Sequence, residues 1–288
     1  MSVLATEKKL RSAIISVISY GAVYGTAYTD SEILHYIPVK ANIVGLRNHL
    51  NRLQKRGIIS VDKHGRYKLK NNTYPSQRIQ QKNWHEIVRS AQKHTRLLRA
   101  VPFIKSIVVL PQSDERSIRI AVIALPARLH LARLLVERFF AGRTLENSQK
   151  KQIEVIDTLY FTTAGLRYLG DFGFCDLDRI VCLLSAEPIF GKKVWRTMLE
   201  KNEYIRAQSP NYIWARNDTA VYASSLRTLD SYDDKAYRAF LKAMANKKEY
   251  RHGGALLRIR PDVIIADPYA DRKKILNQRF AQIQLKVK

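Results

Sequence analysis

Residues 40–70, KANIVGLRNHLNRLQKRGIISVDKHGRYKLK, decide the fold predicted for the first part of this chain. Apolar side chains recur here every three or four positions, the spacing of one helical face, at Ile43, Leu46, Leu50 and Leu53. Gly57 follows them and is typical of a helix end. Beyond it, apolar and polar residues alternate on both sides of Asp62-Lys63-His64-Gly65, which predicts a β-hairpin with a basic tip.

Two more helices are predicted upstream of this stretch. Residues 7–20 carry an apolar stripe at helical spacing, and Thr29 or Asp30 is placed to cap a short helix that ends before Pro38. Three helices followed by a hairpin form the winged-helix arrangement, a variant of the helix-turn-helix. In that arrangement the third helix enters the major groove of DNA and the hairpin lies along the backbone.

The solvent face of the third helix and the hairpin tip hold the candidate binding residues. Lys and Arg can bind phosphates or guanine edges, and Asn can pair with adenine. The candidates are Lys40, Asn42, Arg47, Asn48, Asn51, Arg52, Lys55 and Arg56 on the helix, with Lys63, His64 and Arg66 at the tip. The alternative is that this face is only solvated, on a winged helix that contacts another protein.

The charge of the whole chain favours a polyanionic partner. Fifty Lys and Arg residues oppose 25 Asp and Glu residues, which leaves a formal net charge of +25. Without an anionic partner such a surplus would only cause self-repulsion. Nucleic acid is the favoured partner, with DNA ahead of RNA, and an anionic membrane surface is the main rival. A proteome that is basic throughout would need no partner.

The remaining composition is that of a folded intracellular protein. Apolar residues make up 46% of the 288 residues, which is enough for a buried core. Cys175 and Cys182 are too few for a zinc site, and the sequence has no motif for binding a metal or a nucleotide cofactor. No apolar run approaches the roughly 18 residues of a membrane span, and the first residues lack a signal-peptide pattern. We therefore expect a cytoplasmic protein with no membrane span, metal or cofactor.

A second unit is predicted after a polar linker at residues 73–81. A basic helix at 84–100 comes first and is followed by strands at 103–110 and 117–125. A long helix at 127–141 and a strand at 153–160 come next. Asp176 and Asp178 are expected as the N-cap and a first-turn carboxylate of a later helix. The predicted organisation is residues 1–72, the linker, a mixed α/β core at 82–165, and a helical and mixed part at 166–288 packed on that core.

The order of these elements and several short strings resemble a group of microbial proteins that join an N-terminal winged helix to a nucleotidyltransferase-fold domain. Trp84 and the string Val101-Pro102-Phe103-Ile104 match in place, and residues 128–133, RLHLAR, resemble the helix start after the second strand. Further strings follow in the family's order at residues 160–166, 185–188 and 209–211. The resemblance covers residues 7–215. It implies an α+β fold, with a winged helix followed by a nucleotidyltransferase-like mixed α/β domain and a helical C-terminal part.

The chain departs from that family where an active nucleotidyltransferase needs its catalytic groups. Such an enzyme needs a Gly-Ser turn for the triphosphate and an Asp-x-Asp pair on the next strand to hold two Mg²⁺ ions. Those positions hold Pro111-Gln112-Ser113 and Ile118-Arg119-Ile120, and isoleucine cannot bind magnesium. We therefore predict no catalytic residue in this domain, which would instead serve as a surface that binds nucleic acid.

The favoured hypothesis is a DNA-binding or regulatory protein in which the winged helix makes the groove contacts. An active nucleotidyltransferase is one alternative, if carboxylates such as Asp114 and Glu115 on the turn lie out of the expected register. A structural component of a ribonucleoprotein, or a protein-interaction scaffold, is the other.

Overall fold

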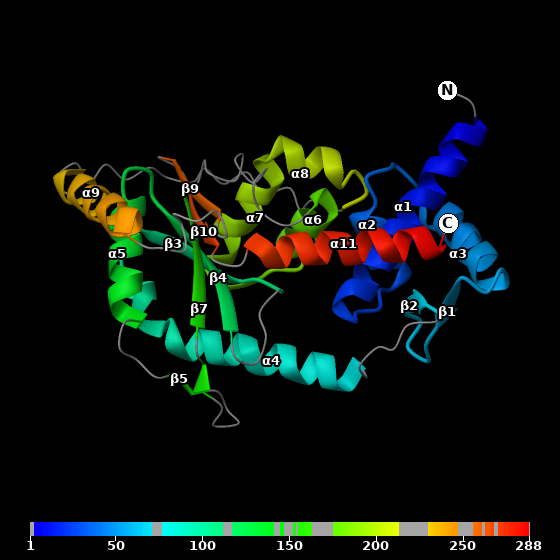
Figure 1. The fold of residues 1–288 in the computed structure, drawn as a ribbon, viewed down its shortest axis with the longest axis horizontal. Helices are drawn as coiled ribbons and strands as arrows, with labels where there is room; N and C mark the ends of the chain where they lie inside the picture. The colour runs from blue at the N-terminus through cyan, green and yellow to red at the C-terminus, as the bar shows by residue number, and fades with distance from the viewer. Residues whose placement is uncertain are drawn as a thin grey trace.

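The structure is a computed structural model of the 288-residue chain. It describes residues 3–70, 77–111, 117–140, 145–146, 152–153, 155–162, 175–212, 230–246, 256–260, 263–267 and 270–287. Figure 1 shows the N-terminal elements at one end of the molecule, the main sheet toward the other end, and the last helix reaching between them.

The N-terminal unit contains the three helices and the hairpin that the sequence predicts. They are α1 (Val3–Tyr24), α2 (Asp30–Tyr36), α3 (Ile43–Lys55), β1 (Ile59–Val61) and β2 (Tyr67–Leu69). Thr29 caps α2 in a capping box: its hydroxyl accepts from the Glu32 N–H, and the Glu32 carboxylate accepts from the Thr29 N–H. Gly57 ends the third helix as expected, with a left-handed φ of 71°.

A six-stranded mixed sheet forms the centre of the second unit. Its strand order is β8-β3-β4-β7-β10-β9, and β4 and β7 run parallel whereas the other neighbours are antiparallel. The strands are β3 (Ile104–Val109), β4 (Ser117–Ala124), β7 (Val155–Thr162), β8 (Glu187–Phe190), β9 (Leu256–Arg260) and β10 (Val263–Asp267). A separate two-stranded pair joins β5 (Leu145–Glu146) to β6 (Gln152–Ile153). The prediction of a mixed α+β architecture is confirmed.

Side chains alternate along the central strands, so that both faces of the sheet are buried. On β4, Ile118, Ile120 and Val122 enter one apolar core. Ala121 and Ile123 enter the other. Helices cover both faces, as the near-continuous apolar sequence of β4 requires.

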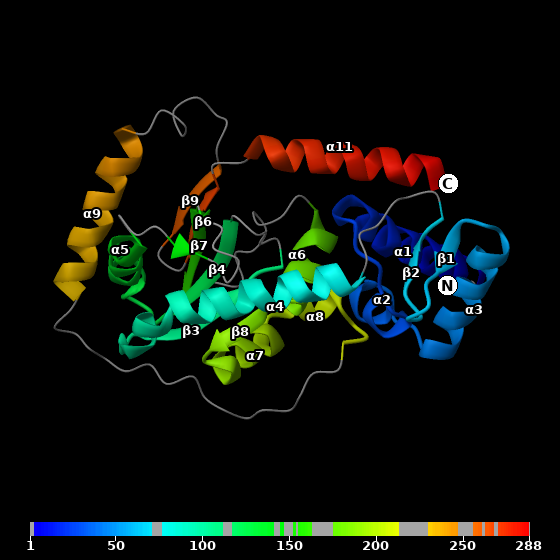
Figure 2. The ribbon, with the colours of Figure 1, turned by 90° about the horizontal axis from the view of Figure 1, so that it is seen from below.

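Figures 1 and 2 show how the helices are distributed around the sheet. The face with Ile118 is packed by α4 (Gln77–His94), a 3₁₀ turn (Arg96–Ala100) and α5 (Leu129–Phe140), with α9 (Asp230–Asn246) lying on α5. The opposite face is packed by α6 (Asp176–Leu184), α7 (Lys192–Lys201) and α8 (Glu203–Gln208).

The core on this second face continues into the N-terminal unit without a break. Ile14 and Ile18 of α1, Leu50 of α3 and Ile180 of α6 belong to the same buried cluster as the sheet residue Phe161. The last helix, α11 (Ala270–Val287), also lies along α1, and Figure 2 shows the two helices side by side. The N-terminal unit is therefore held against the rest of the chain by shared apolar packing.

Some boundaries differ from those expected. The helix predicted at 84–100 begins earlier, at Gln77 inside the expected linker, and gives way to the 3₁₀ turn after His94. The strand β8 was not predicted, because its four residues are too few to show an alternating pattern. Asp178 lies in the first turn of α6 as expected, but the N-cap is Cys175, so Asp176 lies inside the first turn and does not cap the helix. Within the described ranges, no helix is both long and apolar enough to span a membrane.

Candidate nucleic-acid interface

α3 packs through one side and turns the other to solvent. Its first turn is capped by Asn42, whose side-chain oxygen accepts from the Gly45 N–H at 2.7 Å. Leu46, Leu50 and Leu53 are completely or almost completely buried and hold the helix against the N-terminal core. The opposite face is therefore fixed in solvent, where its side chains are available to a partner.

Val44, Asn48, Asn51 and Lys55 form this outer face of α3, here called the groove face. The spacing of these residues places them in one row opposite the three leucines. All four are exposed, and Val44 keeps 64% of its surface accessible. Val44 was not among the sequence candidates, although an exposed apolar residue in a helix without acids is a usable signal.

Arg47 lies beside the groove face and is already paired. Its Nε donates to Asp30 Oδ2 at 2.7 Å, and the Ser31 N–H donates to the other carboxylate oxygen of Asp30 at 2.8 Å. Partial burial opposes ionisation of Asp30, but these hydrogen bonds outweigh it and lower the pKa of its carboxyl. The ion pair keeps the half-exposed guanidinium close to the start of α2.

The remaining arginines of α3 turn away from the groove face. Arg52 and Arg56 point toward α1, and Arg52 Nη1 lies 3.9 Å from Glu7 Oε1. The structure thus divides the predicted helix residues into two groups that face different directions.

Two residues expected on the third helix precede it. Asn42 is the N-cap, and Lys40 lies in the loop before it, because the helix begins only at Ile43. Lys40 is exposed beside the helix start. Asn42 uses its side-chain oxygen for the cap.

The hairpin tip is shaped by Asp62. Its carboxylate accepts from the His64 N–H at 2.8 Å and from the Arg66 N–H at 3.0 Å. Burial opposes ionisation of this carboxyl too, but the two N–H groups outweigh it and lower its pKa. Gly65 adopts the left-handed φ of 71° that closes the turn. Lys63 and His64 are left exposed at the tip, as the sequence predicts.

Arg66 points back to the body of the N-terminal unit, away from the tip. Its Nη1 donates to the Ala27 carbonyl at 3.0 Å and lies 3.9 Å from Glu32 Oε2, and its side chain is only 21% exposed. Next to it, the Tyr67 N–H donates to the Tyr28 carbonyl at 2.7 Å. Arg66 and Tyr67 therefore anchor the hairpin, and the side chain of Arg66 is committed to a structural contact.

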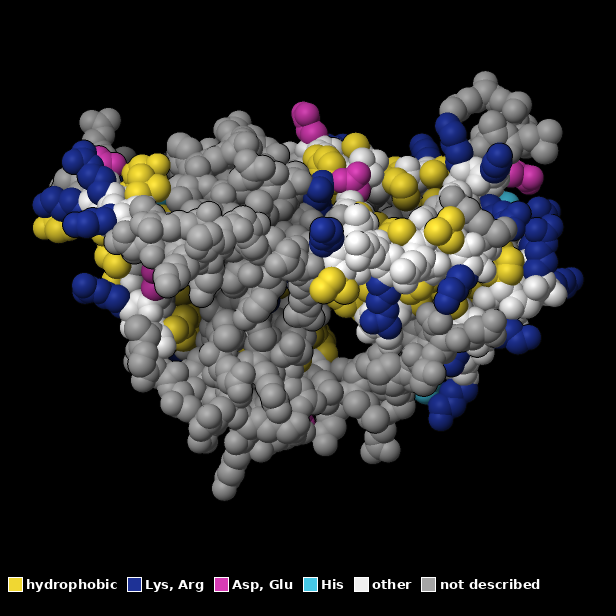
Figure 3. Space-filling view, in the orientation of Figure 1, with side chains coloured by type: hydrophobic (Ala, Val, Ile, Leu, Met, Phe, Trp, Pro, Cys, Tyr) yellow, Lys and Arg dark blue, Asp and Glu magenta, His cyan; other side chains and the backbone are white. Residues whose placement is uncertain are grey.

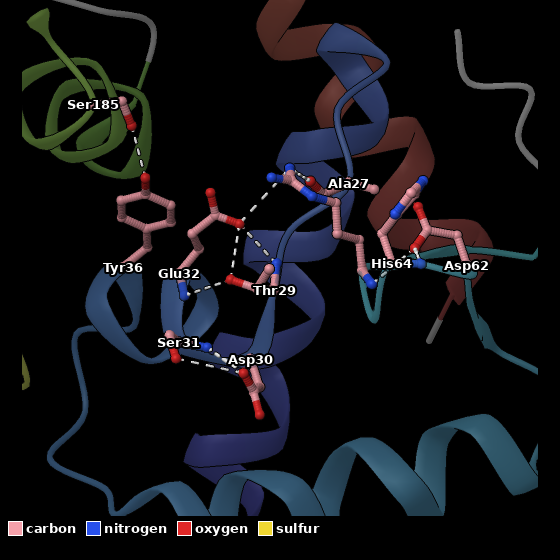
Figure 4. Close-up of polar contacts among 10 residues, drawn as sticks. Ala27, Thr29, Asp30, Ser31, Glu32, Tyr36, Asp62, His64 and Ser185 are labelled. Atoms are coloured by element: carbon pink, nitrogen blue, oxygen red, sulfur yellow. Dashed lines mark hydrogen bonds and ion pairs between the residues drawn. The ribbon is translucent and has the colours of Figure 1, made fainter. Parts of the chain in front are cut away.

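The chain between Glu32 and Asp62 contains no acidic residue, so α3 itself contributes only positive charges. The nearby acids are engaged in local hydrogen bonds: Figure 4 shows Asp30 with Ser31, Glu32 with Thr29, and Asp62 with His64. Figure 3 shows Lys and Arg side chains gathered at the end of the molecule where α3 lies.

An asparagine far along the chain holds the loop before α3. Asn211 accepts from the Ala41 N–H at 2.9 Å and donates to the carbonyls of Leu34 and Val39 at 3.2 and 2.8 Å. The sequence string around Asn211 did not suggest this contact, because its partners lie some 170 positions away.

Further polar contacts join the N-terminal unit to α6 and its C-cap residue Ser185. The Tyr20 hydroxyl donates to Asp178 Oδ1 at 2.7 Å in a buried site, and the Tyr36 hydroxyl lies 2.7 Å from Ser185 Oγ (Figure 4). Burial, and then the charge of Asp178, raise the pKa of Tyr20 well above its ordinary value, so this hydroxyl stays protonated and continues to donate. Together with Asn211, these contacts define the orientation of α3 relative to the sheet.

The positions that the sequence resemblance would assign to a metal-binding Asp-x-Asp pair hold core residues on β4. Ile118 and Ile120 are buried between β4 and the helices α4 and α5, and Arg119 lies between them on the strand. Pro111 ends the described part of the first strand region, and residues 112–116, with Gln112, Ser113, Asp114 and Glu115, lie outside the described residues. In the portion that the structure covers, no group of three or more His, Cys, Asp or Glu side chains is arranged to hold a metal ion.

Comparison of the chain with models of protein families, with curated proteins and with solved structures finds no match.

Proposed function

We propose that this protein binds double-stranded DNA, with α3 in the major groove and the hairpin tip on the backbone. The observation that carries the proposal is the groove face itself: Asn48, Asn51 and Lys55 are exposed in one row, on a helix without acids, with the basic hairpin tip following it in the chain. A major groove accommodates an α-helix, and each of these side chains matches a group displayed there.

The chemistry of the groove face suits reading of bases as well as phosphates. An Asn amide can donate to and accept from the edge of adenine, and Lys can bind guanine or phosphate oxygens. The exposed Val44 offers the kind of apolar contact that a thymine methyl group receives in such interfaces. The tip residues Lys63 and His64 supply donors for the backbone.

DNA is favoured over RNA because of groove shape. The major groove of an A-form RNA helix is too narrow and deep to admit a protein helix, whereas that of B-form DNA is wide enough. The winged-helix interpretation is supported by the order of three helices and a hairpin. It is also supported by the antiparallel backbone pairing of Tyr28, in the loop between α1 and α2, with Tyr67 of β2.

The second unit would act as a structural scaffold (here called the mount) that holds this DNA-binding surface in place. Its resemblance to a nucleotidyltransferase domain is part of the same proposal, and the buried Ile118 and Ile120 support a non-catalytic role for that part of the sheet. The contacts of Asn211, Tyr36 and Tyr20 give the mount a defined orientation.

The test is a salt titration of the full-length chain with a short labelled DNA duplex and, separately, a labelled RNA hairpin. We expect duplex affinity to fall steeply between about 50 and 200 mM salt. Replacing Lys55 and Lys63 together by Ala should reduce the slope of log K against log salt by about 1.8, because each lost phosphate contact is worth about 0.9.

Lys192 and Lys193 provide the matched control. They are exposed at the start of α7, a helix that Figure 1 shows away from α3, so their double replacement by Ala removes the same charge from a different surface. The control should keep the wild-type slope. If both double variants lower the slope equally, binding depends only on net charge, and the assignment to α3 and the hairpin is refuted. If the wild-type chain does not bind the duplex at all, the proposed function is refuted.

A further inference from the structure

A second basic surface lies between α1 and α3, on the side of α3 that faces α1. The two helices enclose an open cleft of about 260 Å³, here called the α1–α3 cleft. Its basic residues are Lys8 and Arg11 from α1, His49 and Arg52 from α3, and Arg56, the C-cap of α3. Lys8, Arg11 and His49 were not among the sequence candidates.

The cleft brings together like charges that repel one another. Among the described residues that line it, Glu7 is the one acid. Its carboxylate lies 3.9 Å from Arg52 Nη1, and both side chains are at least half exposed. Such an exposed ion pair contributes little. The lining therefore keeps a net positive charge, which an anion would relieve.

The pKa of His49 reflects the positive charge of this cleft. Partial burial, and then the positive charge of Arg52 and of Arg11, lower the pKa of its imidazole, while Glu7 acts in the opposite direction. At neutral pH a neutral imidazole still offers one N–H donor. The cleft thus contains guanidinium, ammonium and imidazole donors in one small volume, which is the set of groups that bind phosphate oxygens.

We propose that the α1–α3 cleft binds a backbone phosphate of the same DNA whose major groove receives α3. This rests on the proposed function and extends it, because it adds α1 to the interface. The placement follows from the helix: Asn51 belongs to the groove face, and Arg52, the next residue, lines the cleft about 100° further around the axis. A strand bordering the groove would therefore pass the cleft while α3 reads the base edges.

The α1 side of the cleft gives the sharper test, since Lys8 and Arg11 have no part in the groove face. We expect the variant Lys8→Gln with Arg11→Gln to reduce the salt slope of duplex binding by about 0.9, because the cleft loses its one phosphate contact. The ratio of wild-type to variant affinity should then shrink about 3.5-fold between 50 and 200 mM salt. The charge-matched control replaces Lys192 and Lys193 by Gln, and urea midpoints show whether the variants remain folded.

The outcomes separate this inference from the function on which it rests. If the wild-type chain binds no duplex, the proposed function fails. If the wild-type chain binds and the Lys55–Lys63 variant weakens it, but the α1 variant keeps the wild-type slope, only the cleft assignment is wrong.

Free phosphate is tested separately by calorimetry with inorganic phosphate and with a mononucleotide. Suppose the wild-type chain binds either ligand tightly, the α1 variant loses that binding, and the salt slope of the variant for duplex stays unchanged. The cleft would then be a site for a small phosphorylated ligand, and the backbone assignment would be overturned. Weak or undetectable binding of both, with a reduced duplex slope, is the expected result.

Discussion

Replacing Asn211 by Ala should loosen the loop that leads into α3. The change removes three hydrogen bonds: one from the Ala41 N–H at 2.9 Å and two to the carbonyls of Leu34 and Val39 at 3.2 and 2.8 Å. A typical hydrogen bond contributes about 1 kcal/mol net, so the loss is about 3 kcal/mol. All three sites are only partly buried, and water that replaces the side chain would reduce the loss toward about 2 kcal/mol.

Two measurements check this prediction. The free energy of unfolding in urea gives the total loss, and hydrogen exchange at the Ala41 amide reports the local one, because that N–H loses its acceptor. Since Asn42, the next residue, caps α3, duplex affinity should fall as well. Salt slope should stay near the wild-type value, because no cation is removed.

Asn51→Ala is the matched control. It makes the same chemical change on the exposed groove face, so the free energy of unfolding should stay within about 0.5 kcal/mol of wild type while duplex affinity drops. The reasoning is refuted if Asn211→Ala also changes stability by less than about 0.5 kcal/mol and leaves the Ala41 amide protected.

Two further predictions concern the stability of the fold around α7 and α2. Gly191→Ala should destabilise the fold by about 3 kcal/mol or more in urea unfolding, because Gly191 has a φ of 63° and a methyl group there would overlap the Lys105 carbonyl oxygen. Tyr36→Phe should flatten the loss of stability at alkaline pH. Burial raises the pKa of Tyr36 to about 12, so between pH 10 and 12 the unfolded chain ionises there and the folded chain does not. Stability then falls by about 1.4 kcal/mol per pH unit for this group, and the Phe variant should lack that part of the slope.

Each of these has a result that would contradict it. A Gly191→Ala protein as stable as wild type would mean that the turn before α7 can move away from β3. Parallel stability curves for wild type and Tyr36→Phe above pH 10 would mean that the phenol ionises freely in the folded protein. Measurements below pH 9 serve as the internal baseline, because neither state ionises there.

Local sequence patterns predicted most of the elements that carry the candidate site. The apolar spacing in residues 43–53, the stop at Gly57 and the alternation around the hairpin were sufficient for α3, β1 and β2, because helical and strand periodicity depends on neighbouring residues. The exposed positions of Asn48, Asn51 and Lys55 followed from the same spacing. The inward position of Arg66 could not be predicted in this way, because its partner, the Ala27 carbonyl, lies 39 positions earlier in the chain.

The sequence by itself determined the basic charge, the helix and strand types and the outward row on α3, all of which depend on composition or on residues within a few positions of one another. The tertiary structure alone decided the order of the sheet, the burial of Ile118 and Ile120 under helices, the clamp of Asn211 and the meeting of Lys8 and Arg11 with α3. These features join segments from tens to well over a hundred residues apart. Such pairings depend on which apolar faces bury one another in the folded chain, and periodicity along the sequence carries no information about that choice.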